Sequence, residues 1–312
     1  MRNALLIPLG AGIFSALLHL SVTAGSPMAF MLAYFAQAPV AAVGLSLGFI
    51  NSAVAAAFAA ILVLIGSPGV GALSLYLLIS ALPVLVIVYF AVQNRPDQDG
   101  NASWYPLGHL LGWLPALGLA AFTITLIAFM FGDGGMRLAI EHFLRSMFTG
   151  IQGVDTAQID RFIETSARIF PTIAVASWAL MNIVNCSLAQ RLVTAAEKNI
   201  RPMPSYRCIE APLWPLATAV LGGILLFLGG EIGFFGLNIL LISTIPFFFI
   251  GLAVLHSISA AWPGRPFLLA GAYIFLVLAH WPAVLLVALG TLEPWLRLRE
   301  KADARHSNKG NE

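Results

Sequence analysis

The sequence predicts an all-α protein: a polytopic transmembrane helical bundle of about 8–10 membrane segments with an amphipathic helical hairpin. Of its 312 residues, 59% are hydrophobic and only 10% are charged, whereas soluble domains have about 25% charged residues. Apolar runs of about 18 residues or more recur along the chain, and each can cross a bilayer as a helix. The net charge of +2 is too small to indicate nucleic-acid binding. The lipid bilayer is therefore the first partner that the composition implies.

The apolar segments follow one another closely from the N-terminus. The first has a basic start and small residues around Ala24, so a cleaved signal peptide is an alternative. A retained helix is favoured, because the apolar part is long for a signal and further spans follow at once. Short loops of Gly, Ser and Pro join the first four segments, which predicts tightly packed antiparallel helices. The segments lie at about 4–22, 28–45, 48–66, 71–92, 107–131, 169–190, 211–229, 233–257 and 266–292.

Small residues four positions apart line one face of the first segment. Ala11 stands above Ser15, and Gly12 above Ala16. Such faces let two helix backbones approach closely in a membrane. They are candidates for an interface with a partner protein, and ordinary packing within the bundle is the alternative.

The segment between the fifth and sixth spans is amphipathic. Apolar residues recur at helical spacing from Ile140 to Ile151, and Arg137, Glu141 and Arg145 stand four apart on the polar side, where they can pair. A helical hairpin on the bundle surface follows, either a lid or simple packing. We therefore divide the chain into N-terminal transmembrane helices (1–132), this hairpin (133–168), C-terminal transmembrane helices (169–296) and a basic cytoplasmic tail (297–312).

Lysine and arginine gather in the 191–210 loop and in the tail, and both are expected on the cytoplasmic side. That placement needs an even number of crossings between them, whereas the segments give three. A break in the last segment at His280-Trp281-Pro282 would restore the parity.

Signatures of known catalysis are absent from the sequence. It has no GxSxG elbow, no phosphate-binding GxxxxGK[ST] loop and no HExxH. The histidines are scattered and the two cysteines, Cys186 and Cys208, are expected to be free thiols, so no metal or cofactor is predicted. An enzyme remains an alternative only if Glu141 and His142, or Glu231, lie beside a cavity.

Neutral amides and imidazoles take the place of charges inside the spans, where ionised groups would mark proton or ion paths. Glu231 and Glu293 lie near segment ends, where water is expected to reach them. Asn182 and Asn185 share one helix face. Two readings stay open: hydrogen bonds between helices, or a polar cavity for a small molecule, lined also by Trp178 and Trp214.

The stretch from Gly236 to His256 leaves the same two interpretations open, helix packing or a binding cavity. Asn238 and His256 are 18 residues apart, five helical turns, so a continuous helix would place both on one inward face. Pro246 between them is expected to bend that helix. A binding cavity and plain packing both fit this pattern.

The C-terminal third has a pattern of polar, glycine and aromatic positions: Asn238, Gly251, Leu252, His256, Tyr273, Leu289, Gly290, Glu293, Trp295 and Arg299. Further upstream the pattern includes Pro171, Asn185, Arg191, Pro212 and Trp214, and near the N-terminus only Pro39 and Gly48. On these residues the chain resembles the YybS-like family of uncharacterised bacterial membrane proteins. The resemblance implies a multi-pass protein of the bacterial inner membrane.

That family is in turn similar to the substrate-capturing components of energy-coupling-factor transporters, six-helix bundles that work with a membrane coupler and ATPases. The likeness implies a small-molecule binding or transport component, with Asn182, Asn185, Asn238, His256, Trp178 and Trp214 as candidate ligand-binding residues. It also implies a coupler contact at Ala11, Gly12, Ser15 and Ala16. The additional helices of this chain depart from the family pattern. A non-catalytic scaffold subunit of a membrane assembly, docking through the basic loop and tail, is the alternative.

Overall fold

The computed structural model confirms an all-α, multi-helix membrane protein. It describes residues 2–67, 69–97, 99–130, 134–148, 155–205, 209–210, 212–260, 262–279 and 281–302. Within these ranges seven helical stretches are long and apolar enough to cross a membrane. Cys208, His280 and tail residues 303–312 lie outside the described residues. The chain forms two compact units: unit 1 holds 1–114 and 177–205, and unit 2 holds 115–176 and 206–312.

Unit 1 is built from the first four predicted spans and from parts of two long helices. Two spans are interrupted: the second by a turn at 34–37, and the fourth by a stretch of π-helix. The loop after the fourth span contains a short antiparallel hairpin that the sequence did not suggest. The elements are α1 (Arg2–Leu20), η1 (Ser21–Ala24), α2 (Pro27–Ala33), α3 (Ala38–Leu47), α4 (Phe49–Gly66), α5 (Val70–Leu75), the π-helical η2 (Tyr76–Ala81), α6 (Leu82–Ala91), β1 (Asn94–Pro96) and β2 (Ala102–Trp104), with the start of α7 (Leu107–Met130) and the end of α9 (Thr156–Ala195).

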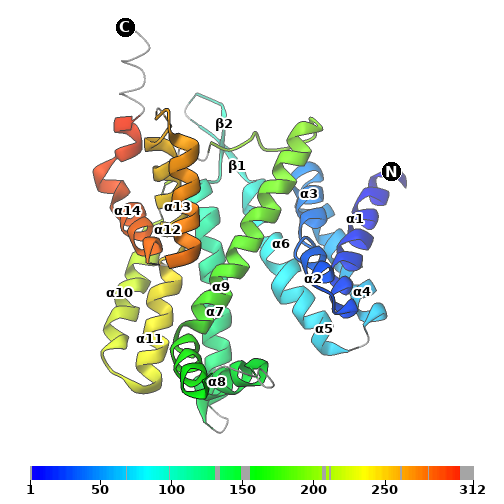
Figure 1. The fold of residues 1–312 in the computed structure, drawn as a ribbon. Coiled ribbons are helices and arrows are strands. Elements are labelled where there is room, and N and C mark those ends of the chain that lie inside the picture. The colour runs from blue at the N-terminus through cyan, green and yellow to red at the C-terminus, as the bar shows by residue number, and fades with distance from the viewer. Residues whose placement is uncertain are drawn as a thin grey trace. The chain divides into compact units, whose positions relative to one another are not determined.

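The small-residue face of α1 packs inside unit 1. Helices α1 and α4 lie side by side (Figure 1), and a Cβ added at Gly12 would lie 2.7 Å from the carbonyl oxygen of Ala55. Ser15 is fully buried and donates to the carbonyl of Ala36 at 2.6 Å, and Ala16 is 1% exposed. This geometry supports ordinary bundle packing, since a coupler would have to displace α4 to reach Gly12.

The loop after α9 folds back onto unit 1. Ile200 N donates to the carbonyl of Leu45 at the end of α3, at 2.9 Å. Arg201 is only 8% exposed and its guanidinium lies 3.5 Å from the carbonyl of Ala91 at the end of α6. Burial lowers the pKa of Arg201 below its ordinary value. Arg201 is therefore not available for docking, whereas Arg191 and Lys198 of the same loop are exposed, so the docking role expected of the 191–210 loop stays a prediction.

Unit 2 contains the remaining helices. The predicted span at 211–229 is a helix of only 13 residues. The last predicted segment is two helices inclined to each other by 119°, and the break between them lies where the sequence predicts it. Helices α10 and α11 form an adjacent pair (Figure 1). The elements are α8 (Gly135–Phe148), α10 (Trp214–Leu226), α11 (Gly230–Ser243), α12 (Ile245–Ile258), α13 (Arg265–Ala279) and α14 (Pro282–Leu296), with the rest of α7 and α9.

The amphipathic helix α8 is tied to the first half of α9 by ion pairs. Arg137 pairs with Glu141 at 3.0 Å, as its spacing predicts, and also reaches Glu164 at 3.6 Å. Arg145 pairs with Asp160 at 2.6 Å. Each pair is partly exposed, so each contributes little stability. Whether this hairpin acts as a lid stays a prediction.

Two glycines allow α12 and α14 to touch. A Cβ added at Gly251 would overlap the carbonyl of Leu286, and one at Gly290 would overlap the carbonyl of Phe247. Close backbone approach through small residues is a main source of helix association in membranes.

Glu293 at the end of α14 is the clearest departure from expectation. It is 4% exposed, and its carboxylate accepts from the backbone N–H of Leu298 at 3.0 Å and from Arg299 Nε at 2.9 Å. Arg299 also donates to the carbonyl of Ile209 at 2.8 Å. The expectation that water reaches this carboxylate is wrong, because the left-handed backbone at Arg297 ends α14 and the N–H groups of Leu298 and Arg299 donate to the carboxylate.

Substituting Gly251→Ala should destabilise the protein by about 1–3 kcal/mol, because the added methyl group forces α12 and α14 apart. The matched control is Gly271→Ala, since a Cβ at that helical position meets no atom within 4 Å. It should be neutral or slightly stabilising. Thermal unfolding in detergent measures both, and equal melting temperatures would contradict the packing argument.

Substituting Glu293→Gln should lower the free energy of unfolding by about 3 kcal/mol, since it removes the buried negative charge that pairs with Arg299 at 2.9 Å. Glu300→Gln serves as the control, because Glu300 is exposed and its 3.8 Å pair with Arg297 is open to solvent. Chemical unfolding of the two variants in detergent gives the comparison. A Glu293→Gln protein as stable as the control would show that the ion pair is not needed for the fold.

Candidate functional site

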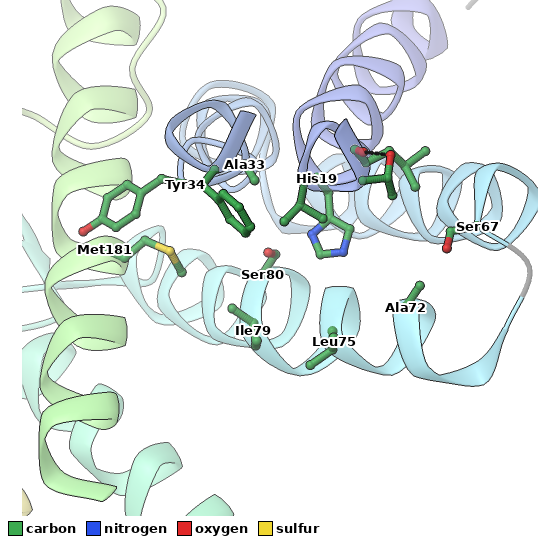
Figure 2. Close-up of a pocket in the computed structure, with 13 residues that line it drawn as sticks. His19, Ala33, Tyr34, Ser67, Ala72, Leu75, Ile79, Ser80 and Met181 are labelled. Atoms are coloured by element: carbon green, nitrogen blue, oxygen red, sulfur yellow. Dashed lines mark hydrogen bonds between the residues drawn. The ribbon is translucent and has the colours of Figure 1, made fainter. Parts of the chain in front are cut away.

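A pocket of about 370 Å³ lies in unit 1 among α1, η1, α2, α5, η2 and α9, with Ser67 just after α4. Figure 2 shows His19 pointing from α1 toward the α5–η2 stretch that carries Ala72, Leu75 and Ser80, with Met181 on α9. This volume falls in the range of small-molecule sites. The lining is His19, Leu20, Val22, Thr23, Phe30, Ala33, Tyr34, Ser67, Ala72, Leu75, Ile79, Ser80 and Met181.

The lining is mostly apolar, with a few neutral polar groups and no carboxylate, lysine or arginine. Hydroxyls come from Thr23, Tyr34, Ser67 and Ser80, and an imidazole from His19. The His19 ring meets the ring of buried Tyr76 edge-on, with centroids 5.2 Å apart, which fixes its direction. Such a surface suits a small ligand that is apolar over most of its area and carries hydrogen-bonding groups.

One wall of the pocket depends on a proline. The carbonyl of Ile79 lies four residues before Pro83, which has no N–H to donate to it. Two side chains donate to that oxygen instead: Gln37 Nε2 at 2.8 Å and Trp178 Nε1 at 2.9 Å. The carbonyl of Ile79, left free by the interruption in η2, therefore joins η2 to the 34–37 turn and to α9.

The paired asparagines of α9 belong to the same wall. Asn182 Nδ2 donates to the carbonyl of Trp178 at 2.9 Å. Asn185 Nδ2 donates to the carbonyls of Tyr34 at 2.9 Å and Met181 at 2.8 Å. Tyr34, Ile79 and Met181 all line the pocket, so the amides and Trp178 hold the backbone of its wall.

Three oxygens of this wall have no hydrogen-bond partner among the described residues. They are Oε1 of Gln37 and Oδ1 of Asn182 and Asn185, on side chains of residues that are 1%, 0% and 0% exposed. Turning an amide over would not help, because each NH₂ faces a carbonyl that can only accept. A buried polar group without a partner costs about 1–3 kcal/mol. Three such acceptors on one wall distinguish it from the rest of the interior.

Asn238, in unit 2, is the opposite case. Its Oδ1 accepts from the backbone N–H of Thr172 at 3.2 Å and the hydroxyl at 2.8 Å, and its Nδ2 donates to the carbonyls of Arg168 and Phe234, both at 3.0 Å. The amide bridges Arg168 and Thr172 of α9 beside Pro171. All four hydrogen-bonding positions are used, which favours the packing interpretation for Asn238.

The other two candidates in unit 2 are also separate from the pocket residues. His256 Nε2 forms a hydrogen bond of 2.9 Å with Tyr273 OH, and Trp214 begins α10 with its side chain partly exposed. Asn238 and His256 lie on one helical stretch, Gly230–Ile258, as their spacing predicts, and this stretch is interrupted only at Thr244, two residues before Pro246.

Sequence reasoning found half of the pocket wall. Trp178, Asn182 and Asn185 lie in unit 1, whereas Asn238, His256 and Trp214 lie in unit 2. The missed residues include Tyr34, Ile79 and Ser80. Pro83 inside an apolar span was the one available signal, since it marks a free carbonyl at Ile79. A binding role for the six candidates stays a prediction.

Comparison with known proteins gives a family and no function. The family model described as a predicted membrane protein (DUF2232) matches residues 12–292. No curated protein matches the chain, and no solved structure matches it. The match supports an uncharacterised family of membrane proteins, and the finer likeness to transporter components stays an expectation. Because the matched region spans most of the chain, this protein belongs to the DUF2232 family of predicted membrane proteins.

Proposed function

We propose that this chain is the small-molecule binding component of a membrane transport system, which takes its energy from partner proteins. The observation that carries the proposal is the pocket of about 370 Å³ in unit 1, with neutral polar groups on an apolar wall. Directly behind lining residues Tyr34, Ile79 and Met181, three buried amide oxygens have no partner among the described residues. The NH₂ groups of these amides are enough to hold the wall, so the oxygens are available to a ligand.

The position of the pocket supports capture from the non-cytoplasmic side. Ser67, directly after α4, lines the pocket, whereas Ile200 of the basic loop is bonded to Leu45, just before α4. The two features therefore lie at opposite ends of α4, whose 18 residues span about 27 Å. Basic loops favour the cytoplasm, so the pocket end is proposed to face outward in a bacterial inner membrane.

The energy source is proposed to be external. The sequence has no phosphate-binding loop, so ATP hydrolysis would require separate ATPase subunits and a membrane coupler. The scaffold alternative loses only Arg201 from its proposed docking surface, because Arg201 is buried, while Arg191 and Lys198 of the basic loop are exposed. The enzyme alternative is also weaker, because Glu141 is paired with Arg137.

Filling the pocket should abolish ligand retention. Protein purified with Ala33→Trp is expected to lose a small molecule that the unmodified protein carries, because the indole occupies the pocket. Leu32→Trp is the matched control, since Leu32 is the preceding residue on α2, is 45% exposed and does not line the pocket. Mass spectrometry of the denatured extracts compares the three proteins. Absence of any retained molecule in unmodified protein, or equal retention in both variants, would refute the proposal.

The proposed orientation can be tested separately. In a background without Cys186 and Cys208, Thr23→Cys should react with a membrane-impermeant maleimide in intact cells, because exposed Thr23 is at the pocket end. Lys198→Cys, in the basic loop, should react only after permeabilisation. The reverse pattern of labelling would show that the pocket faces the cytoplasm.

A further inference from the structure

The three unpartnered amide oxygens belong to one closed ring of contacts. From Asn182 the ring passes through a hydrogen bond to Trp178, through Trp178 to the carbonyl of Ile79, and from there to Gln37. The 34–37 turn leads from Gln37 to Tyr34, whose carbonyl accepts from Asn185. Asn185 returns to Asn182 within one turn of α9. Each link is a hydrogen bond shorter than 3 Å or a few residues of chain, so the ring encloses one small region of unit 1.

The chemistry of this region is that of an acceptor site. Each NH₂ group donates to a backbone carbonyl. The three amide oxygens remain as hydrogen-bond acceptors without a partner among the described residues. The groups that satisfy them are a metal cation or a ligand rich in N–H or O–H. Neutral amide and carbonyl oxygens are hard ligands that suit alkali cations and ammonium groups. With no carboxylate among the ring residues, the charge that can be balanced is small, which favours a monovalent cation over a divalent one.

The helix interruption explains how the amides are positioned. The break in η2 before Pro83 leaves the carbonyl of Ile79 without a helical N–H, and Gln37 Nε2 and Trp178 Nε1 donate to it instead. Both lone pairs of this carbonyl are thereby used, so the atoms of the ring that can bind a ligand are the three amide oxygens.

We propose that Gln37, Asn182 and Asn185 form a binding site for a monovalent cationic group at the wall of the pocket. The group is either the primary ammonium of the solute or a free alkali ion bound beside it. The inference rests on the proposed function, because it describes what the same pocket recognises.

Thermal unfolding of the purified full-length protein tests the site directly. The protein is titrated in detergent with sodium, potassium, methylammonium and choline chlorides at matched ionic strength. A cation that binds only the folded state raises the melting temperature in a saturable way, and choline is too large to enter the ring. We expect a saturable rise with at least one small cation and none with choline. A stronger response to methylammonium than to alkali ions identifies the solute's ammonium, and the reverse identifies a free ion.

Variants locate the response. Asn182→Leu, Asn185→Leu and Gln37→Met should each reduce the shift to the choline level. Asn238→Leu is the matched control: Asn238 is equally buried, but its amide is fully bonded in unit 2, so this variant should be less stable and keep the cation response. Asn51→Leu, which changes a partly exposed amide of α4 bonded to Leu47, is a milder control.

Should the leucine variants fail to fold, Asn182→Asp at pH 8 provides a second test. It should lower the half-saturating cation concentration by about tenfold or more, since it adds a negative charge beside the cation.

Two results would overturn the inference. One is a melting temperature of the unmodified protein that is the same in all four salts, which would mean that the three oxygens bind water only. The other is an unchanged cation response in the three ring variants or in Asn182→Asp. These results are distinguishable from failure of the proposed function: retained solute without a cation response refutes the cation site alone, whereas a cation response without retained solute refutes the solute-binding role alone.

Discussion

Unit 1 depends on the requirement that polar groups inside an apolar bundle find their hydrogen-bond partners within the protein. Pro83 creates the demand, because it cannot donate to the carbonyl of Ile79. Gln37 and Trp178 meet it. The π-helical stretch, the 34–37 turn and α9 are thereby joined at one oxygen atom, and the pocket lies against this junction. A backbone irregularity that would be a defect in an isolated helix is here the attachment point of three segments.

The same requirement separates structural amides from candidate binding amides. Asn238 uses both of its amide groups to repair α9 beside Pro171, so its burial is explained by the fold. Asn182 and Asn185 use only their NH₂ groups, and their oxygens are left over. The three asparagines are therefore equally buried but differ in how many of their hydrogen-bonding atoms the fold uses. The count of satisfied atoms, and not the residue type, distinguishes a packing residue from one that can hold a ligand.

Unit 2 solves its packing by different means. Glycine at positions 251 and 290 brings the backbones of α12 and α14 into contact, which increases dispersion contacts where lipid offers no hydrophobic driving force. Glu293, a deeply buried carboxylate of this unit, is compensated by Arg299 and by backbone N–H groups. The pair lies where α14 ends, on either side of the left-handed residue Arg297. A charge can therefore be kept inside this protein when its counter-charge is six residues away along the chain.

Composition and local pattern determined the class of this protein and much of its layout. Long apolar runs can only be helices in lipid, glycine and alanine at four-residue spacing allow close helix contacts, and a proline removes one helical hydrogen bond and so favours a break. Those are local properties, so the membrane bundle, the α1 face and the break before α14 could be anticipated. Tertiary structure alone decided which polar groups meet. Neither the burial of Glu293 nor the ring of Gln37, Asn182 and Asn185 follows from spacing, because each depends on contacts between segments distant in sequence.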